Sequence, residues 1–184
     1  MKNYLKKYPW LRTQNLYTGK VEDDYCALND IPEGWVFAFG EMFCEEMDAV
    51  LKELGISDRF FVAQMKEKFG SLRFYPSVRD EKISKVVQKY ETLSCHICIH
   101  CGKPDVHIVE TGWYGPMCEE CYQNKSHLSD SYTYDSVIDK TQPQMMTDLI
   151  QLKDHSKERE LDIWETANKI RKSWEENNKN RRTV

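Results

Sequence analysis

The sequence predicts an α+β fold: a helix–β-hairpin–helix layer, then a small cysteine-rich module, then a C-terminal helical extension. Two stretches with apolar residues at the helical period, 32–54 and 80–93, flank an alternating stretch at 59–75. Two Cys-x-x-Cys pairs follow, and a helical pattern returns after residue 143. We divide the chain into an irregular aromatic-rich arm (1–31), an α+β core (32–93), a cysteine module (94–125), a linker (126–142) and a helical extension (143–184).

The composition is that of a folded protein. Of the 184 residues, 40% are hydrophobic and 12% aromatic, enough to bury a modest core. No run approaches the roughly 18 to 20 apolar residues of a membrane span, so we expect no membrane contact. The start, MKNYLKKYPWLR, lacks the apolar run of a secretory signal. We therefore expect a cytoplasmic protein whose seven cysteines are thiols and metal ligands rather than disulfides.

Charge is unevenly distributed, although the net charge of −4 argues against a dedicated duplex-binding protein. Residues 1–20 hold five basic side chains and no acid, whereas residues 21–58 hold eleven acids and one lysine. Residues 66–89 and 169–184 each carry a net charge of +4. The pattern indicates either an ordinary mixed surface or acidic and basic faces that dock within the chain or onto a partner.

The N-terminal arm contains many rings without a clear period. Pro9 and Gly19 interrupt it, so we predict an irregular segment that packs its aromatic side chains onto the domain.

The first helix is predicted over residues 32–54. Asp30 is the expected N-cap and Gly55 the expected C-cap. The apolar side chains form one stripe, and the acids lie mostly on the opposite face, as expected of a helix that faces the core. Gly34 and Gly40 lie inside this pattern, where they allow close backbone packing.

Residues 59–75 predict a β-hairpin that turns at Phe69-Gly70-Ser71. One face of it carries basic groups beside aromatic rings: Lys66, Lys68, Arg73 and Tyr75. Such a face can hold single-stranded nucleic acid or a nucleotide by charge and stacking. The alternative is an ordinary exposed sheet face, in which aliphatic lysine stems cover the rings.

The second core helix is predicted over residues 80–93, with Ser77 or Asp80 as its cap. Its buried stripe consists of Ile83, Val86, Val87, Tyr90 and Leu93. Lys82, Lys85 and Lys89 are expected along its outer side.

The C-terminal extension carries a short heptad seam formed by Ile163, Ala167, Ile170 and Trp174. This seam spans only about two heptads. It either docks on the chain's own domain or pairs with a second copy, which would give a homo-oligomer through residues 150–176.

The strongest signal is the pair of motifs Cys98-Ile-His-Cys101 and Cys118-Glu-Glu-Cys121, with sixteen residues between them. Four thiolates at this spacing are typical of a tetrahedral zinc site. Gly102 suits the tight knuckle after the first pair, a short hairpin is expected next, and the second pair begins a helix. Knuckle, hairpin and helix in this order predict a treble-clef finger with one structural Zn²⁺ ion.

Two alternatives concern this module. Cys95 with Cys98 also has metal-ligand spacing, so a swapped register, or a second metal bound by His96 and His100, stays open.

The module also resembles HNH-type nucleases, in which an Asp-His pair activates the metal. Here Asp105 and His107 are separated by one residue, the motif's Asn is missing and Tyr122 replaces the closing His. We therefore keep an active or degenerate nuclease only as an alternative and expect no enzyme.

A set of motifs in one order extends over residues 8–125: PWLRTQNLYTG, LNDIPEGWVFAFGEMFCEE, QMKEKFGSLRFY, KYETLS, CIHCGKP and GWYGPMCEEC. This order resembles a family of uncharacterised zinc-finger proteins encoded in phages and prophages. The resemblance implies an accessory protein in the cytoplasm of an infected bacterium, where such proteins often block host defences by binding a host protein or a nucleotide signal.

We therefore expect a non-catalytic, zinc-stabilised interaction protein that binds a host protein. The candidate contact surfaces are the basic-aromatic hairpin and the C-terminal helix. Binding of nucleic acid or a nucleotide through Lys66, Lys68, Arg73 and Tyr75 is the second hypothesis.

Overall fold

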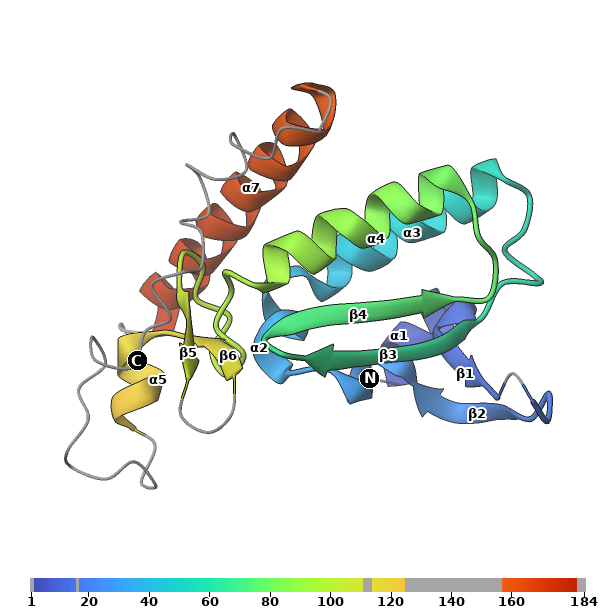
Figure 1. Ribbon diagram of the computed structural model, residues 1–184, viewed down its shortest axis with the longest axis horizontal. Coiled ribbons are helices and arrows are strands. Elements are labelled where there is room, and N and C mark those ends of the chain that lie inside the picture. Colours follow the sequence, from blue (N-terminus) through green and yellow to red (C-terminus); the bar gives the residue numbers. More distant parts are fainter. Residues whose placement is uncertain (1, 16, 111–113, 125–156, 182–184) are drawn as a thin grey trace.

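A computed structural model describes residues 2–15, 17–110, 114–124 and 157–181. They form a mixed α+β fold around a four-stranded sheet with the strand order β2-β1-β3-β4 (Figure 1). The strands are β1 (Arg12–Gln14), β2 (Val21–Cys26), β3 (Val62–Lys68) and β4 (Ser71–Pro76). Neighbouring strands are antiparallel except β1 and β3, which pair in parallel through Thr13 and Val62. Figure 1 shows α3 and α4 side by side on one side of β3 and β4.

The N-terminal arm differs from the irregular segment expected from the sequence. It forms α1 (Lys2–Lys7), η1 (Pro9–Leu11), β1, β2 and η2 (Ala27–Asp30). Its aromatic side chains do pack onto the domain, since Tyr8 and Trp10 are buried. The sequence pattern does not predict these two strands, because β1 is only three residues long and β2 is an edge strand with mostly exposed side chains. The pairing of β1 with β3, and of β2 with β1, is a tertiary effect.

The helix predicted over 32–54 is confirmed as one continuous helical stretch: α2 (Glu33–Trp35), a π-helical turn η3 (Val36–Gly40) and α3 (Glu41–Glu53). Gly55 ends it with a φ of +64°, and its N–H donates to Lys52 O at 3.0 Å. Asp30 is not the N-cap. Pro32 occupies that position without a side-chain hydrogen bond, and the Asp30 carboxylate accepts from the Tyr25 hydroxyl instead.

The predicted hairpin and second helix are confirmed as β3–β4 and α4 (Glu81–Ser94). Phe69 and Gly70 form the turn, both with positive φ, as two-residue hairpin turns often require. Asp80 caps α4 by accepting from Lys82 N–H at 2.8 Å. On the outer edge of β4, Leu72 N–H donates to Ser94 Oγ at 2.8 Å and Phe74 N–H to Glu91 Oε1 at 3.2 Å. Helix α4 thereby covers hydrogen-bonding groups that an edge strand would leave open.

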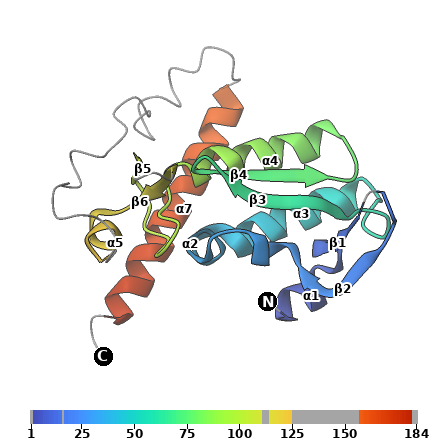
Figure 2. The ribbon, with the colours of Figure 1, turned by 60° about the horizontal axis from the view of Figure 1, so that its bottom comes forward.

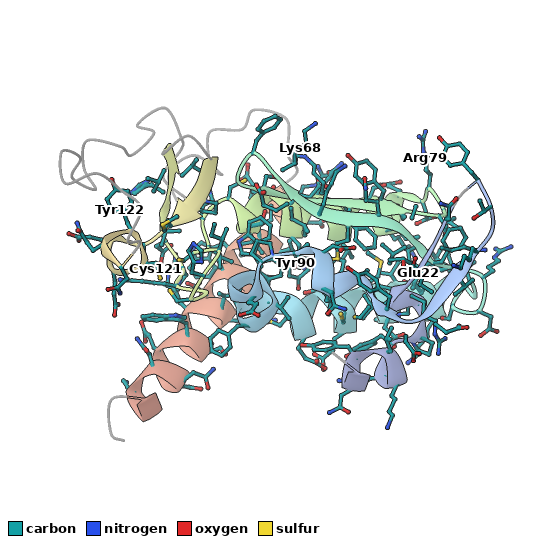
Figure 3. The ribbon with its side chains drawn as sticks, turned by 90° about the horizontal axis from the view of Figure 1, so that it is seen from below. Glu22, Lys68, Arg79, Tyr90, Cys121 and Tyr122 are labelled. Carbon is teal, nitrogen blue, oxygen red and sulfur yellow. The ribbon has the colours of Figure 1, made fainter. Side chains whose placement is uncertain are left out.

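The core lies between the sheet and the helices and is dominated by rings. Phe43 of α3 packs edge-to-face on Trp10, Phe74 and Tyr90, with centroid distances of 5.2 to 6.3 Å. Tyr90 lies in the interior of the molecule (Figure 3) and donates its hydroxyl to Glu46 at 2.8 Å. The arm, the sheet, α3 and α4 therefore share one core.

The cysteine module and the C-terminal helix lie at one end of this core (Figures 1 and 2). The module contains β5 (His107–Glu110), β6 (Tyr114–Met117) and α5 (Glu119–Gln123), and the C-terminal helix is α7 (Lys157–Arg181). The linker predicted at 126–142 and the first part of the extension lie outside the described residues. No helix among the described residues is long and apolar enough to cross a membrane.

Several acidic and basic segments dock within the chain, as one of the two charge hypotheses proposed. Lys7 of the basic N-terminus pairs with Glu41 of α3. Lys82 of α4 pairs with Glu53 at the other end of α3. These contacts are exposed and contribute little stability individually. They show that part of the acidic segment 21–58 faces basic segments of its own chain.

Candidate metal centre

The four cysteines of the two pairs come together in one cluster. Cys98 and Cys101 lie in the loop after α4, Cys118 precedes α5, and Cys121 lies in its first turn. Their Sγ atoms all lie within 4.8 Å of one another, and those of Cys101 and Cys118 are 3.6 Å apart. In the part of the chain that the structure describes, no other group of three or more His, Cys, Asp or Glu side chains is close enough to hold an ion.

This spacing fits a tetrahedral metal ion. Zn–S bonds of about 2.3 Å in a regular tetrahedron place the sulfur atoms about 3.8 Å apart. The 3.6 Å separation of Cys101 and Cys118 is close to that value. It is also far too long for a disulfide, and none of the four cysteines is in one. The cluster therefore fits a metal site with four protein ligands and no open coordination position.

The first pair is held by a tight backbone knuckle. Gly102 has a φ of +75°, a conformation that favours glycine, and its N–H donates to Cys98 O at 3.0 Å. Cys98 N–H donates to Lys103 O at 2.8 Å. The Ile99 N–H donates to Pro116 O of β6 at 3.0 Å, which joins the knuckle to the small hairpin.

The second pair is organised by α5. The Cys118 thiol sulfur accepts from Cys121 N–H at 3.5 Å, and Tyr122 N–H donates to Cys118 O at 2.9 Å. Tyr122 is buried against the cluster and follows Cys121 directly (Figure 3).

The electrostatics of the cluster favour a cation. Burial, followed by the charge of Cys98, raises the pKa of Cys121 to about 12. Hydrogen bonds from Cys101 and Cys118 lower the pKa of Cys98. One thiolate is thus stabilised at the expense of its neighbours, because four anions cannot share this space without a positive charge. A divalent ion would allow all four thiols to ionise.

The alternative register is not the one found. Cys95 is the C-cap residue of α4, and its thiol approaches Glu91 O at 3.5 Å. Neither Cys95 nor His96 or His100 belongs to the metal-binding group. The pairing of Cys98 with Cys101 is therefore confirmed.

The knuckle is attached to the core through α2. Gly34 N–H donates to Ile99 O at 3.0 Å, and a Cβ on Gly34 would overlap the carbonyl oxygen of Cys98. The buried Trp35 indole N–H donates to Ile97 O at 2.8 Å. The close backbone packing expected at Gly34 is thus confirmed, and its partner is the metal knuckle.

The tip of the β3–β4 hairpin also contacts the module. A Cβ on Gly70 would lie 3.0 Å from Ile108 of β5 and 3.3 Å from Pro116 of β6. The module therefore contacts the turn of the β3–β4 hairpin as well as the start of α2.

Helix α7 docks on the core and the module of its own chain. Ile163, Ala167 and Ile170 are buried in the main core. Arg171 forms a two-pronged ion pair with Asp105, in which its Nη2 lies 2.7 Å from Oδ1. Lys103 Nζ lies 5.8 Å from the centroid of the Trp174 ring. The apolar seam predicted from the sequence thus packs on the core of its own chain.

Lys89 does not lie on the outer side of its helix, where the sequence pattern predicted it. Its side chain is only 5% exposed and pairs with Glu46 of α3 and with Asp162 of α7, the latter at 3.0 Å. The position of α7 buries this lysine, and the sequence carries no signal for that contact.

The residues that resemble nuclease ligands have other surroundings. Asp105 has a φ of +58° and holds Arg171 with both carboxylate oxygens. His107 begins β5 opposite Met117. Tyr122 is buried beside the cysteine cluster.

The basic-aromatic face of the β3–β4 hairpin forms as predicted. Lys66 pairs across the strands with Arg73, and Gln64 with Tyr75, so these side chains share one face with Lys68. Lys66 Nζ lies 5.5 Å from the centroid of the Tyr75 ring, and Lys68 Nζ lies 5.1 Å from that of Phe69. The Tyr75 side chain is 46% exposed and that of Phe69 is 69% exposed. Arg73 is half-buried and donates to Ser71 Oγ at 2.7 Å.

No family model, curated protein or solved structure matches this chain.

Proposed function

We propose that the protein is a non-catalytic interaction protein whose fold is organised by one structural zinc ion. The observation that supports this most strongly is the four-cysteine cluster, which offers four ligands and is joined to the core through Gly34 and Trp35. A site closed by four thiolates leaves no position for a substrate or an activated water. Its role is then to hold the neighbouring surfaces in place.

The proposed ion is zinc and the proposed module is a treble clef. Four thiolates in a tetrahedron suit zinc better than the oxygen-preferring metals. The knuckle at Cys98–Cys101, the β5–β6 hairpin and α5 follow one another in the order of that motif.

The proposed contact surface is the hairpin face that carries Lys66, Lys68, Phe69, Arg73 and Tyr75. Exposed aromatic side chains beside basic groups suit an acidic protein surface with apolar anchors. The metal module fixes the turn of this hairpin through Gly70. We propose a host protein as the partner, in the bacterial cytoplasm, on the strength of the resemblance described above.

A second candidate is binding of single-stranded nucleic acid or a nucleotide by the same face. The pairing of exposed rings with neighbouring cations supports it. We rank it second because the Lys66 ammonium group lies over the Tyr75 ring, on which a base would have to stack.

Charge reversal on this face tests both candidates. The variant combines Lys66→Glu with Lys68→Glu. The control combines Lys169→Glu with Lys172→Glu, two exposed lysines of α7 that undergo the same change in charge. Each protein is used to capture partners from a bacterial lysate and, separately, to titrate a single-stranded oligonucleotide at several salt concentrations.

The proposal predicts a captured protein that is lost with the hairpin variant and kept with the control. Oligonucleotide affinity that falls steeply with salt and disappears in the hairpin variant would instead favour the second candidate. Equal capture by both variants would remove the hairpin face as the contact surface. Magnesium-dependent DNA cleavage that is lost in His107→Ala would overturn the non-catalytic assignment.

A further inference from the structure

A pocket of about 570 Å³ opens between the N-terminal segments and the end of α3 with the loop that follows it. None of its lining residues belongs to the metal centre or to the basic-aromatic hairpin face. Its volume lies within the range of roughly 300 to 1,000 Å³ that is usual for small-molecule sites.

The pocket carries an excess of positive charge. Two acids and four basic residues line it: Asp48, Asp58, Lys7, Arg12, Lys52 and Arg59. Lys52 is paired with Asp48 at 2.7 Å, and Lys7 is paired with Glu41 and Glu45 of α3. Arg12, Arg59 and the acid Asp58 then remain without an ion pair in the lining, so the charge available to a ligand is still positive.

Both arginines retain free donors. Within the described ranges of the chain, the Arg59 guanidinium makes no hydrogen bond or ion pair. Arg12 uses only its Nε, which donates to Asp23 O at 3.3 Å and lies 3.8 Å from the exposed Asp23 carboxylate. The planar guanidinium fork suits the oxygens of a phosphate or carboxylate.

The remaining wall is aromatic and contains Trp10, Phe60 and Phe61. Trp10 and Phe60 are buried and pack edge-to-face with a centroid distance of 5.9 Å. Phe61 is partly exposed and is the aromatic side chain of this wall that a ligand can reach.

We propose that this pocket binds a small organic anion with a planar ring, the chemistry of a nucleoside monophosphate. Arg12 and Arg59 hold the phosphate, and the ring lies against the partly exposed side chain of Phe61. The site is independent of the hairpin face, so its test does not depend on the protein partner proposed above.

The experiment is isothermal titration of the full zinc-loaded chain with AMP, GMP, CMP and UMP, and with inorganic phosphate and adenosine as half-ligands. We expect at least one nucleotide to bind more tightly than inorganic phosphate by about tenfold or more. Arg59→Glu should weaken that binding by at least about tenfold, because it replaces a donor with a repelling charge. Arg59 is exposed, so the variant should fold, and an unchanged melting temperature verifies this.

Lys169→Glu on α7, which does not line the pocket, is the control for the added negative charge and should bind as the unaltered chain does. Arg12→Gln is the second variant and should also weaken binding. Absence of binding by all four nucleotides up to about 1 mM overturns the proposal. Equal affinity for nucleotide and phosphate overturns it as well, since the ring would contribute nothing. Binding that survives both arginine variants places the ligand elsewhere and overturns it too.

Discussion

Gly34 and Gly102 lie in direct contact: a Cβ on Gly102 would lie 2.7 Å from the carbonyl oxygen of Gly34. Gly34 in turn donates its N–H to Ile99 O at 3.0 Å. The start of α2 and the metal knuckle thus meet backbone to backbone. This contact makes the metal centre part of the main fold rather than an appended module.

Gly34→Ala should destabilise the protein strongly. The position has helical backbone angles, where alanine alone would be favoured by roughly 1 kcal/mol. The added Cβ would overlap Cys98 O and lie 2.7 Å from the carbonyl carbon of Ile99, so the backbones must separate. We expect a net cost of about 3 kcal/mol, the upper end for overpacking, measured by chemical denaturation. A cost below about 1 kcal/mol would show that the backbones at Gly34 and Cys98 can separate with little loss of stability.

Gly102→Ala separates backbone strain from packing when it is compared with Gly55→Ala. Both glycines have similar positive φ values, +75° and +64°, but a Cβ on Gly55 would meet nothing within 4 Å. Gly55→Ala should therefore cost only the strain, about 1 to 2 kcal/mol, and Gly102→Ala should cost more. Equal free energies of unfolding for the two variants would contradict the packing argument.

Metal removal should loosen the core as well as the module. One zinc ion per chain is expected by elemental analysis, and a chelator should lower the melting temperature by about 10 °C or more. Cys98→Ser should have the same effect. Cys95→Ser is the matched control, because Cys95 lies outside the cluster and should retain the ion. Unchanged melting after complete chelation would refute a structural metal.

Helix α7 should be held mainly by its apolar stripe. Ile170→Ala removes a side chain that is buried in the core and should cost about 2 to 4 kcal/mol. Leu161→Ala, on the exposed side of the same helix, should change the free energy of unfolding by less than about 0.5 kcal/mol. Similar costs at both positions would mean that the helix does not dock in this orientation.

The oligomer suggested by the seam can be tested by mass. Sedimentation of the full chain and of a chain that ends before Lys157 reports the oligomeric state with and without α7. A monomer in both cases would remove the proposed homo-oligomer through residues 150–176.

Glu91 should make stability depend on pH. Burial raises the pKa of its carboxyl, although the Phe74 N–H and Arg73 oppose the shift. Because the folded pKa lies above the unfolded one, the stabilising contribution is complete below the unfolded pKa and is lost as pH rises through the folded pKa. Glu91→Gln keeps an acceptor for Phe74 N–H without the charge. Its free energy of unfolding relative to the unaltered protein should therefore be higher at pH 7 than at pH 4. A difference that is constant with pH would contradict this account.

Local patterns were sufficient to predict the helices at 32–54 and 80–93, the β3–β4 hairpin and the four cysteines of the cluster, but not α1 in the N-terminal arm. Each of these features depends on residues only a few positions apart, so it can be recognised in the sequence. Examples are the apolar stripe around Phe43 and Met47, the positive-φ turn at Gly70 and the two cysteine spacings. The two N-terminal strands were not predicted, because β1 gains its structure from pairing with β3 and β2 exposes most of its side chains as an edge strand.

Short-range spacing was enough to predict the two cysteine pairs and the apolar stripes of the helices, although it left the register at Cys95 open and misplaced Lys89. Three contacts became known from the three-dimensional structure: the metal knuckle packs on Gly34, α7 docks on its own chain, and Lys89 and Asp105 form ion pairs with that helix. These contacts join segments between about 60 and 75 residues apart, and no local pattern encodes where such segments meet.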